Sequence, residues 1–255
     1  MKQVTPQSAR AYVDAIELPR TRGSTGFESG DAVLDLDADK DQAAVVGSEV
    51  VSFAKGVSVD QRNDIINCAL LAQLVANKRV SDRSNLIQWY KEYFDVLSNL
   101  GWTIENNGFS SYEEKADGLE AHEAILKVAA VVLGAAPTAL AVVTSTIQAM
   151  KSMDADNPWI TIFDRESKQS NTARFQVSLA TQSSSDFGLS LMAFALEAQS
   201  TLTQVLFFKI RRDKVRLQQC STQVAINEEV LNSVRNKVKN KLAGMAGGFV
   251  DSLDL

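Results

Sequence analysis

The chain has 255 residues, of which 45% are hydrophobic, so it is long enough to bury a sizeable core. Its formal net charge of −5 argues against a nucleic-acid-binding protein, for which a basic balance is typical. The two cysteines do not amount to a disulfide framework, and the single histidine excludes multi-histidine metal sites, so we expect no metal and no cofactor.

The first ten residues have no apolar run behind Lys2, and no conventional secretory signal peptide is visible. We therefore expect a protein that is cytoplasmic as synthesised and that is exported, if at all, by another route. Residues 1–40 hold prolines and glycines among polar residues and are predicted to form an arm with about one helical turn. Such an arm wraps over its own domain or over a neighbour, which makes a homo-oligomer one candidate assembly.

Four helical segments are predicted within residues 41–151. The first covers Asp41 to Lys55, and the second opens at Ser58 with Gln61 in capping-box spacing. The third runs from Leu86 to Leu100 with apolar residues spaced by three and four, and Gly101 stands at its C-terminal stop. The fourth begins near Ser111 and runs toward Gly134, after which Pro137 starts a further helix.

Residues 152–255 alternate like strands and are predicted to form an antiparallel meander followed by an amphipathic helix capped by Asn227. Phe175, Val177 and Leu179 alternate with polar residues, which indicates a strand with one face in water. The tail around Val250 is expected to fold back onto the body. The predicted strands are Trp159–Phe163, Ala173–Ala180, Phe187–Ala198, Thr203–Ile210, which we expect to be central, and Lys214–Ile226.

These patterns predict an α+β protein in which an N-terminal helical bundle packs on a C-terminal antiparallel β-meander closed by a terminal amphipathic helix. The predicted organisation is an arm over 1–40, a helical region over 41–151 and a sheet with a C-terminal helix over 152–255. The last two regions are expected to form one compact unit.

The segment from Val128 to Met150 contains no charged residue and has the length of a membrane-crossing helix of about 20 residues. Gly134 and Pro137 divide it, which favours two short helices, apolar all round and buried behind the sheet. The alternative is an element that inserts into a membrane under some condition. A buried segment predicts that Val132→Asp unfolds the protein. The candidate insertion residues are Val131, Val132, Leu133, Leu140, Val142 and Val143.

Basic residues gather at one hairpin turn and on the last helix, and solvated faces are their ordinary explanation. If the two groups lie side by side, they form a candidate surface for anionic lipid or for an acidic protein partner. The candidates are Lys209, Arg211, Arg212, Lys214, Arg216, Lys237, Lys239 and Lys241.

The remaining motifs favour structural interpretations. The run Asp35, Asp37, Asp39 and Asp41 opens like a calcium loop but lacks its glycine and its glutamate, so it is interpreted as a helix cap. His122 is interpreted as an exposed structural histidine. Cys220 is interpreted as a free buried thiol, with acylation or nucleophilic reactivity as the alternative, although no histidine lies near it in the sequence.

No residue is assigned a catalytic role. The leading hypothesis is a non-enzymatic membrane- or lipid-associating protein of the toxin or virulence-factor type, soluble before engagement. It rests on the uncharged, membrane-length segment within an otherwise soluble composition. The alternatives are a soluble protein-interaction or homo-oligomeric assembly module, and an enzyme without a recognisable motif.

Overall fold

The computed structural model describes residues 4–18, 34–112, 119–134, 136–182, 187–202, 204–207, 209–210, 215–243 and 249–255, without the side chains of Leu119 and Lys209. Within them the helices are α1 (Pro6–Ala15), α2 (Val59–Arg79), α3 (Leu86–Asn99), α4 (Ala121–Leu133), α5 (Pro137–Lys151), α6 (Pro158–Ser167) and α7 (Glu228–Leu242). The strands are β1 (Gln42–Val46), β2 (Glu49–Phe53), β3 (Trp102–Ile104), β4 (Ser110–Ser111), β5 (Leu119–Glu120), β6 (Lys168–Gln169), β7 (Thr172–Gln182), β8 (Phe187–Ala198), β9 (Lys209–Ile210), β10 (Val215–Ile226) and β11 (Val250–Asp254).

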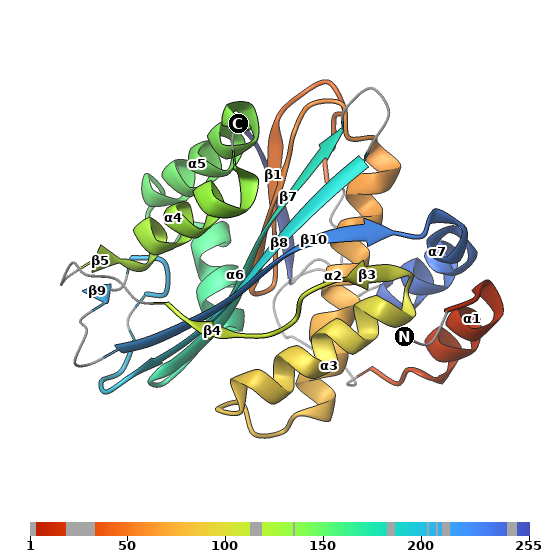
Figure 1. The fold of residues 1–255 in the computed structure, drawn as a ribbon, viewed down its shortest axis with the longest axis horizontal. Helices are drawn as coiled ribbons and strands as arrows, with labels where there is room; N and C mark the ends of the chain where they lie inside the picture. The colour runs from red at the N-terminus through yellow and green to blue at the C-terminus, as the bar shows by residue number, and fades with distance from the viewer. Residues whose placement is uncertain are drawn as a thin grey trace.

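The fold is an α+β sandwich in which one mixed sheet lies between two layers of helices (Figure 1). Among the described residues the sheet has nine strands, in the order β11-β1-β2-β7-β8-β10-β3, with β4 on β10 and β6 on β7. All neighbours are antiparallel except β2 and β7, which are parallel. Helices α1, α2, α3 and α7 cover one face, and α4, α5 and α6 cover the other.

The first half of the chain contributes strands, so the predicted separation of a helical bundle from a C-terminal meander is wrong. Residues Asp41 to Lys55, predicted as a helix, form the hairpin β1–β2, with Val46 paired to Glu49. Gly47 makes the tight turn with a φ of +56°, a region that favours glycine. Both strands are buried on both faces, so their valines form a near-continuous apolar run. Such a run has no alternation that would distinguish a strand from a buried helix.

The predicted meander is confirmed in its long strands and wrong in two shorter segments. Strands β7, β8 and β10 match the alternating patterns closely. Trp159–Phe163 instead lies in helix α6, where the Asn157 side chain accepts the Trp159 N–H at 2.9 Å. Residues 204–207, the described core of the predicted strand 203–210, form no strand, and β8 pairs directly with β10; residues 203 and 208 lie outside the described part of the chain. The apolar residues Val205 and Leu206 of this segment are buried against α4 and α6 rather than within the sheet.

Two of the predicted helix ends follow the local signals, and a third does not. The Ser58 hydroxyl accepts the Gln61 N–H, and Gln61 Oε1 accepts the Ser58 N–H at 3.0 Å, so the predicted capping box is confirmed. Gly101, at a φ of +97°, follows the end of α3 as predicted. The fourth helix begins at Ala121 rather than near Ser111, which lies in β4 and is followed by residues 113–118, outside the described part of the chain.

Both ends of the described chain pack on the body. Helix α1 is longer than the single turn predicted for the arm, and it lies against α7 of the same chain. Strand β11 pairs with β1, which confirms that the tail folds back. The acidic run precedes strand β1, so its interpretation as a helix cap is wrong; the Asp41 carboxylate instead accepts the backbone N–H of Lys55 at 2.6 Å.

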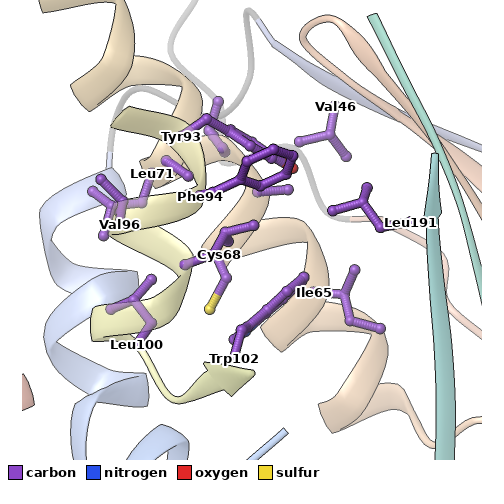
Figure 2. Packing of buried hydrophobic residues seen from close by; sticks show 14 of the residues in the cluster. Val46, Ile65, Cys68, Leu71, Tyr93, Phe94, Val96, Leu100, Trp102 and Leu191 are labelled. Atoms are coloured by element: carbon purple, nitrogen blue, oxygen red, sulfur yellow. The ribbon is translucent and has the colours of Figure 1, made fainter. Parts of the chain in front are cut away.

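Two apolar clusters hold the layers together. The cluster beneath α2 and α3 is shown in Figure 2, where Cys68 of α2 lies between Leu100 and Trp102. The second cluster lies between the sheet and α4–α6 and includes the stacked rings of Phe175 and Phe194, whose centroids are 5.0 Å apart. Both faces of β7 are therefore covered.

The polar face of β7, predicted to be in water, is covered by α2 and α3 and paired there. Gln176 Nε2 donates to the Tyr90 hydroxyl at 3.0 Å. The hydroxyls of Ser178 and Tyr93 each donate to the Glu49 carboxylate at 2.7 Å. A polar strand face is therefore compatible with burial when the covering helices and the neighbouring strand supply partners for it.

Glu49→Gln is expected to stabilise the fold at neutral pH, because burial raises the pKa of the Glu49 carboxyl and a neutral amide avoids the cost of a buried charge. The folded-state pKa of Glu49 lies above its unfolded-state value, so the neutral carboxyl group contributes stability at low pH. That contribution is lost as the pH rises through the folded-state pKa. The gain in unfolding free energy should therefore be clear at pH 7.5 and small near pH 4. Urea unfolding at both values measures it. Glu105→Gln, at an exposed position, is the control. An equal effect of Glu49→Gln at both pH values would show that the pKa of Glu49 is not raised in the folded protein.

Candidate functional site

Helices α4 and α5 form an antiparallel hairpin on one face of the sheet (Figure 1). Gly134 ends α4 and Pro137 starts α5, which confirms that these two residues divide the uncharged segment. One side of each helix is buried in the apolar cluster on the sheet, through Ile125 of α4 and Val143 and Ile147 of α5. The expectation that both helices are buried all round is wrong, because the sheet covers only one side of each.

The other side of the hairpin is exposed where the two helices meet, and we call residues 130–134 and 136–141 the hairpin tip. Val131 is 83% exposed, about twice the value of any other exposed large hydrophobic side chain among the described residues. The exposed residues around it are small or uncharged: Ala130, Gly134, Ala136, Pro137, Thr138 and Ala141. No charged residue occurs between Lys127 and Lys151. A contiguous uncharged, apolar surface of this kind marks a contact site.

The structure separates the predicted insertion residues into two groups. Val131 is exposed, and Val132, Leu133 and Leu140 are half-buried at the tip. Val142 and Val143, in contrast, are buried against the sheet, at 7% and 0% exposure. Four of the six candidates therefore lie on the surface that a partner or a bilayer would meet first.

A groove of about 520 Å³ lies beside the tip, between the first turns of α5 and the ends of β2 and β7. It brings together residues far apart in the sequence, and no sequence motif predicts it as a site. No local pattern relates its residues, so only the packing of α5 on the sheet could reveal it. Its lining includes Asp41, Lys55, Thr138, Ser145 and Thr181.

The basic hairpin turn is described only in part. Arg211, Arg212 and Lys214 lie outside the described residues, as does the side chain of Lys209. Arg216 is exposed near the start of β10, and its register partner on β8 is Glu197. A role of these residues in lipid binding stays a prediction.

Two of the three lysines of α7 contact helix α1 or the residue that follows it. Lys237 Nζ lies 2.6 Å from Asp14 Oδ1, and Lys241 Nζ donates to the Ile16 carbonyl at 2.6 Å. Lys239 is exposed. This group follows the C-terminal end of β10, whereas Arg216 is near the start of that strand, roughly 35 Å away at about 3.3 Å per residue. Arg216 therefore does not lie beside the lysines of α7.

His122 is buried at 6% exposure, so its interpretation as an exposed residue is wrong. It lies at the end of the hairpin opposite the tip, where its Nδ1 is 3.2 Å from Glu120 Oε2 and its Nε2 is 3.4 Å from Lys151 Nζ. Its backbone N–H donates to the Leu206 carbonyl at 2.8 Å. These contacts link the base of α4 to the end of α5 and to the segment that covers it.

Both cysteines are free and buried, as predicted for structural thiols. Cys220 Sγ lies 3.5 Å from the Asn106 carbonyl, and burial raises the pKa of its thiol to about 11. An acylation or nucleophilic role for Cys220 stays a prediction. In the described part of the chain, no three His, Cys, Asp or Glu side chains are grouped so that they could hold a metal ion.

Within the described residues, no helix has both the length and the apolar character needed to cross a bilayer.

No family model matches the chain, and no curated protein matches it. Its α+β fold is similar to that of the Evf virulence factor, over 96% of this chain and 91% of that chain, with 12% identity and a TM-score of 0.38. It is also similar to the activated Cyt2Ba monomer from Bacillus thuringiensis subsp. israelensis, over 53% of this chain and 78% of that chain, with 11% identity and a TM-score of 0.31. At these TM-scores the likeness assigns neither an activity nor a site to this chain.

Proposed function

We propose that the chain is a non-enzymatic, membrane-associating protein that docks on lipid bilayers through the hairpin tip. The observation that carries the proposal is the exposure of Val131, at 83%, within a surface that bears no charge. A charged side chain costs about 3 kcal/mol in the hydrocarbon of a bilayer, so an uncharged tip avoids the main barrier to entry.

The tip has the geometry of a shallow, reversible insertion. Val131, Val132, Leu133 and Leu140 lie close to the turn between two helices, so they can enter the boundary between headgroups and acyl chains while the hairpin stays on the sheet. Withdrawing a patch of a few hundred Å² from water contributes on the order of 5 kcal/mol at about 25 cal/mol per Å². That free energy corresponds to a dissociation constant below about 1 mM.

Val131→Asp is expected to weaken binding to phospholipid vesicles by at least about tenfold, because it removes an apolar anchor and adds a charge at the tip. Vesicle co-sedimentation of the purified chain measures this loss. Thr103→Asp is the matched control, since Thr103 has the size of valine and is exposed on β3, the edge strand beside α3. Near-UV circular dichroism of both variants should match the unmodified chain.

Equal vesicle binding by the Val131→Asp and Thr103→Asp variants would contradict the proposal. A change in molar mass caused by Val131→Asp, without any vesicle binding by the unmodified chain, would instead support the assembly alternative, in which the tip contacts a second copy. Anionic vesicles at low and high salt test the predicted contribution of the basic residues, because attraction to a charged surface weakens as salt rises.

A further inference from the structure

The geometry points to a lipid-headgroup site in the groove beside the hairpin tip, which takes a zwitterionic phospholipid headgroup such as phosphocholine. This inference rests on the proposed function and adds the ligand class and the residues that select it. Thr138, Ala139 and Ala141 belong to the tip and also line the groove. A lipid whose acyl chains contact the tip therefore has its headgroup at the groove mouth.

The groove carries one cation and one anion. Lys55 is exposed at its wall and forms no ion pair with the described residues, so its ammonium group is available to a phosphate. Asp41 lines the same groove, and one of its carboxylate oxygens accepts the Lys55 N–H at 2.6 Å. Its other oxygen can face a ligand ammonium group. A zwitterionic headgroup offers both of the complementary charges.

The remaining lining suits a polar group attached to an apolar tail. The side chains of Thr138, Ser145 and Thr181 supply hydroxyls, which are donors and acceptors for phosphate oxygens. Ala54 and Val142 supply apolar wall. The groove volume of about 520 Å³ lies within the range of roughly 300–1,000 Å³ that is usual for small-molecule sites.

The charges near the groove disfavour a headgroup with a net negative charge. Asp37 and Asp39 lie in the turn that leads to Asp41. Two neighbouring cations are already engaged: Lys40 Nζ lies 2.7 Å from Asp254 Oδ2, and the buried Arg62 guanidinium donates to the backbone carbonyls of Lys40 and Ala54. Excess acid beside the site repels an anion and leaves a neutral headgroup favoured.

Lys55→Gln is expected to weaken binding to phosphatidylcholine vesicles about five- to tenfold, through loss of the charge-assisted contact to phosphate. Asp41→Asn, which keeps an acceptor for the Lys55 N–H, is expected to weaken it less. Lys91→Gln is the matched control, because Lys91 is an exposed lysine on α3 and lies on the other side of the sheet. Vesicles of phosphatidylglycerol at the same salt concentration should bind the unmodified chain more weakly than phosphatidylcholine does.

A second measurement does not depend on membranes. Titration with glycerophosphocholine, followed by the amide NMR signals, should shift Lys55, Thr138 and Ser145, whereas inorganic phosphate at the same concentration should shift them less. Equal shifts with phosphate would overturn the zwitterionic assignment in favour of a simple anion site. Unshifted signals with glycerophosphocholine would overturn the headgroup site.

The outcomes separate this inference from the proposed function. If Lys55→Gln and Lys91→Gln variants bind phosphatidylcholine equally while Val131→Asp loses binding, the headgroup site is wrong and the membrane proposal stands. If the unmodified chain binds no vesicles, the membrane proposal fails. The glycerophosphocholine titration then tests independently whether the groove binds a headgroup.

Discussion

Replacing Arg62 by methionine is expected to lower the free energy of unfolding by about 3–5 kcal/mol, because it removes a fully buried cation and leaves its acceptors without a donor. Arg62 Nε donates to the Val57 carbonyl at 2.9 Å, and Nη1 donates to Gln42 Oε1 at 2.7 Å. Nη2 donates to the carbonyls of Lys40 and Ala54 at 2.9 and 3.2 Å. One side chain thus joins the start of α2 to the ends of β1 and β2.

Urea unfolding at pH 7 measures this loss. Arg10→Met, at an exposed position on α1, is the matched control and is expected to change the unfolding free energy by less than about 0.5 kcal/mol. The Lys40 and Ala54 carbonyls directly precede Asp41 and Lys55 in the chain. Arg62→Met should therefore also speed amide hydrogen exchange at Asp41 and Lys55. A variant as stable as the Arg10→Met control would show that Arg62 does not hold these elements together.

Val143→Asp is expected to unfold the protein, at a cost of at least about 4 kcal/mol. Val143 is 0% exposed and lies between α5 and the sheet, within an apolar cluster that offers no partner for a carboxylate. Domains are stable by only about 5–15 kcal/mol, so a cost of this size leaves a large unfolded population. Val131→Asp, on the exposed side of the same hairpin, places the same charge in water and should leave the fold intact.

The comparison of the two aspartate variants tests how the hairpin lies on the sheet. Near-UV circular dichroism and molar mass in solution distinguish a folded monomer from an unfolded or aggregated chain. A folded, monodisperse Val143→Asp variant would show that α5 does not pack on the sheet as described. Loss of folding in both variants would show that the tip is covered in solution.

The covered face of β7 shows why alternation predicts a strand but does not predict its surroundings. Arg174, Gln176 and Ser178 have the spacing of a face in water, yet Asn77, Tyr90 and Glu49 supply a partner for each of them in turn. These three residues lie on elements distant in the sequence. The spacing of apolar and polar residues along a strand indicates which side chains share a face. Whether that face is buried depends on what packs against it.

The uncharged segment shows the same limit at the candidate site. Gly134 and Pro137 predicted its division into two helices, since both signals act on the backbone within one turn. Which side of each helix is exposed was not predictable, because both sides are apolar and the period is the same whichever side faces the sheet. Only the packing on the sheet leaves Val131 exposed and buries Val143.

The sequence by itself determined three of the helix ends and the long strands of this protein. The cap at Ser58, the stop at Gly101 and the cap at Asn227 are hydrogen-bonding or backbone preferences that operate within a few residues. Tertiary structure alone decided that the valines of β1 and β2 form strands, that the tip is exposed, and that Lys55 and Thr138 share a groove. Each of those outcomes depends on contacts between distant segments, and no local pattern encodes them.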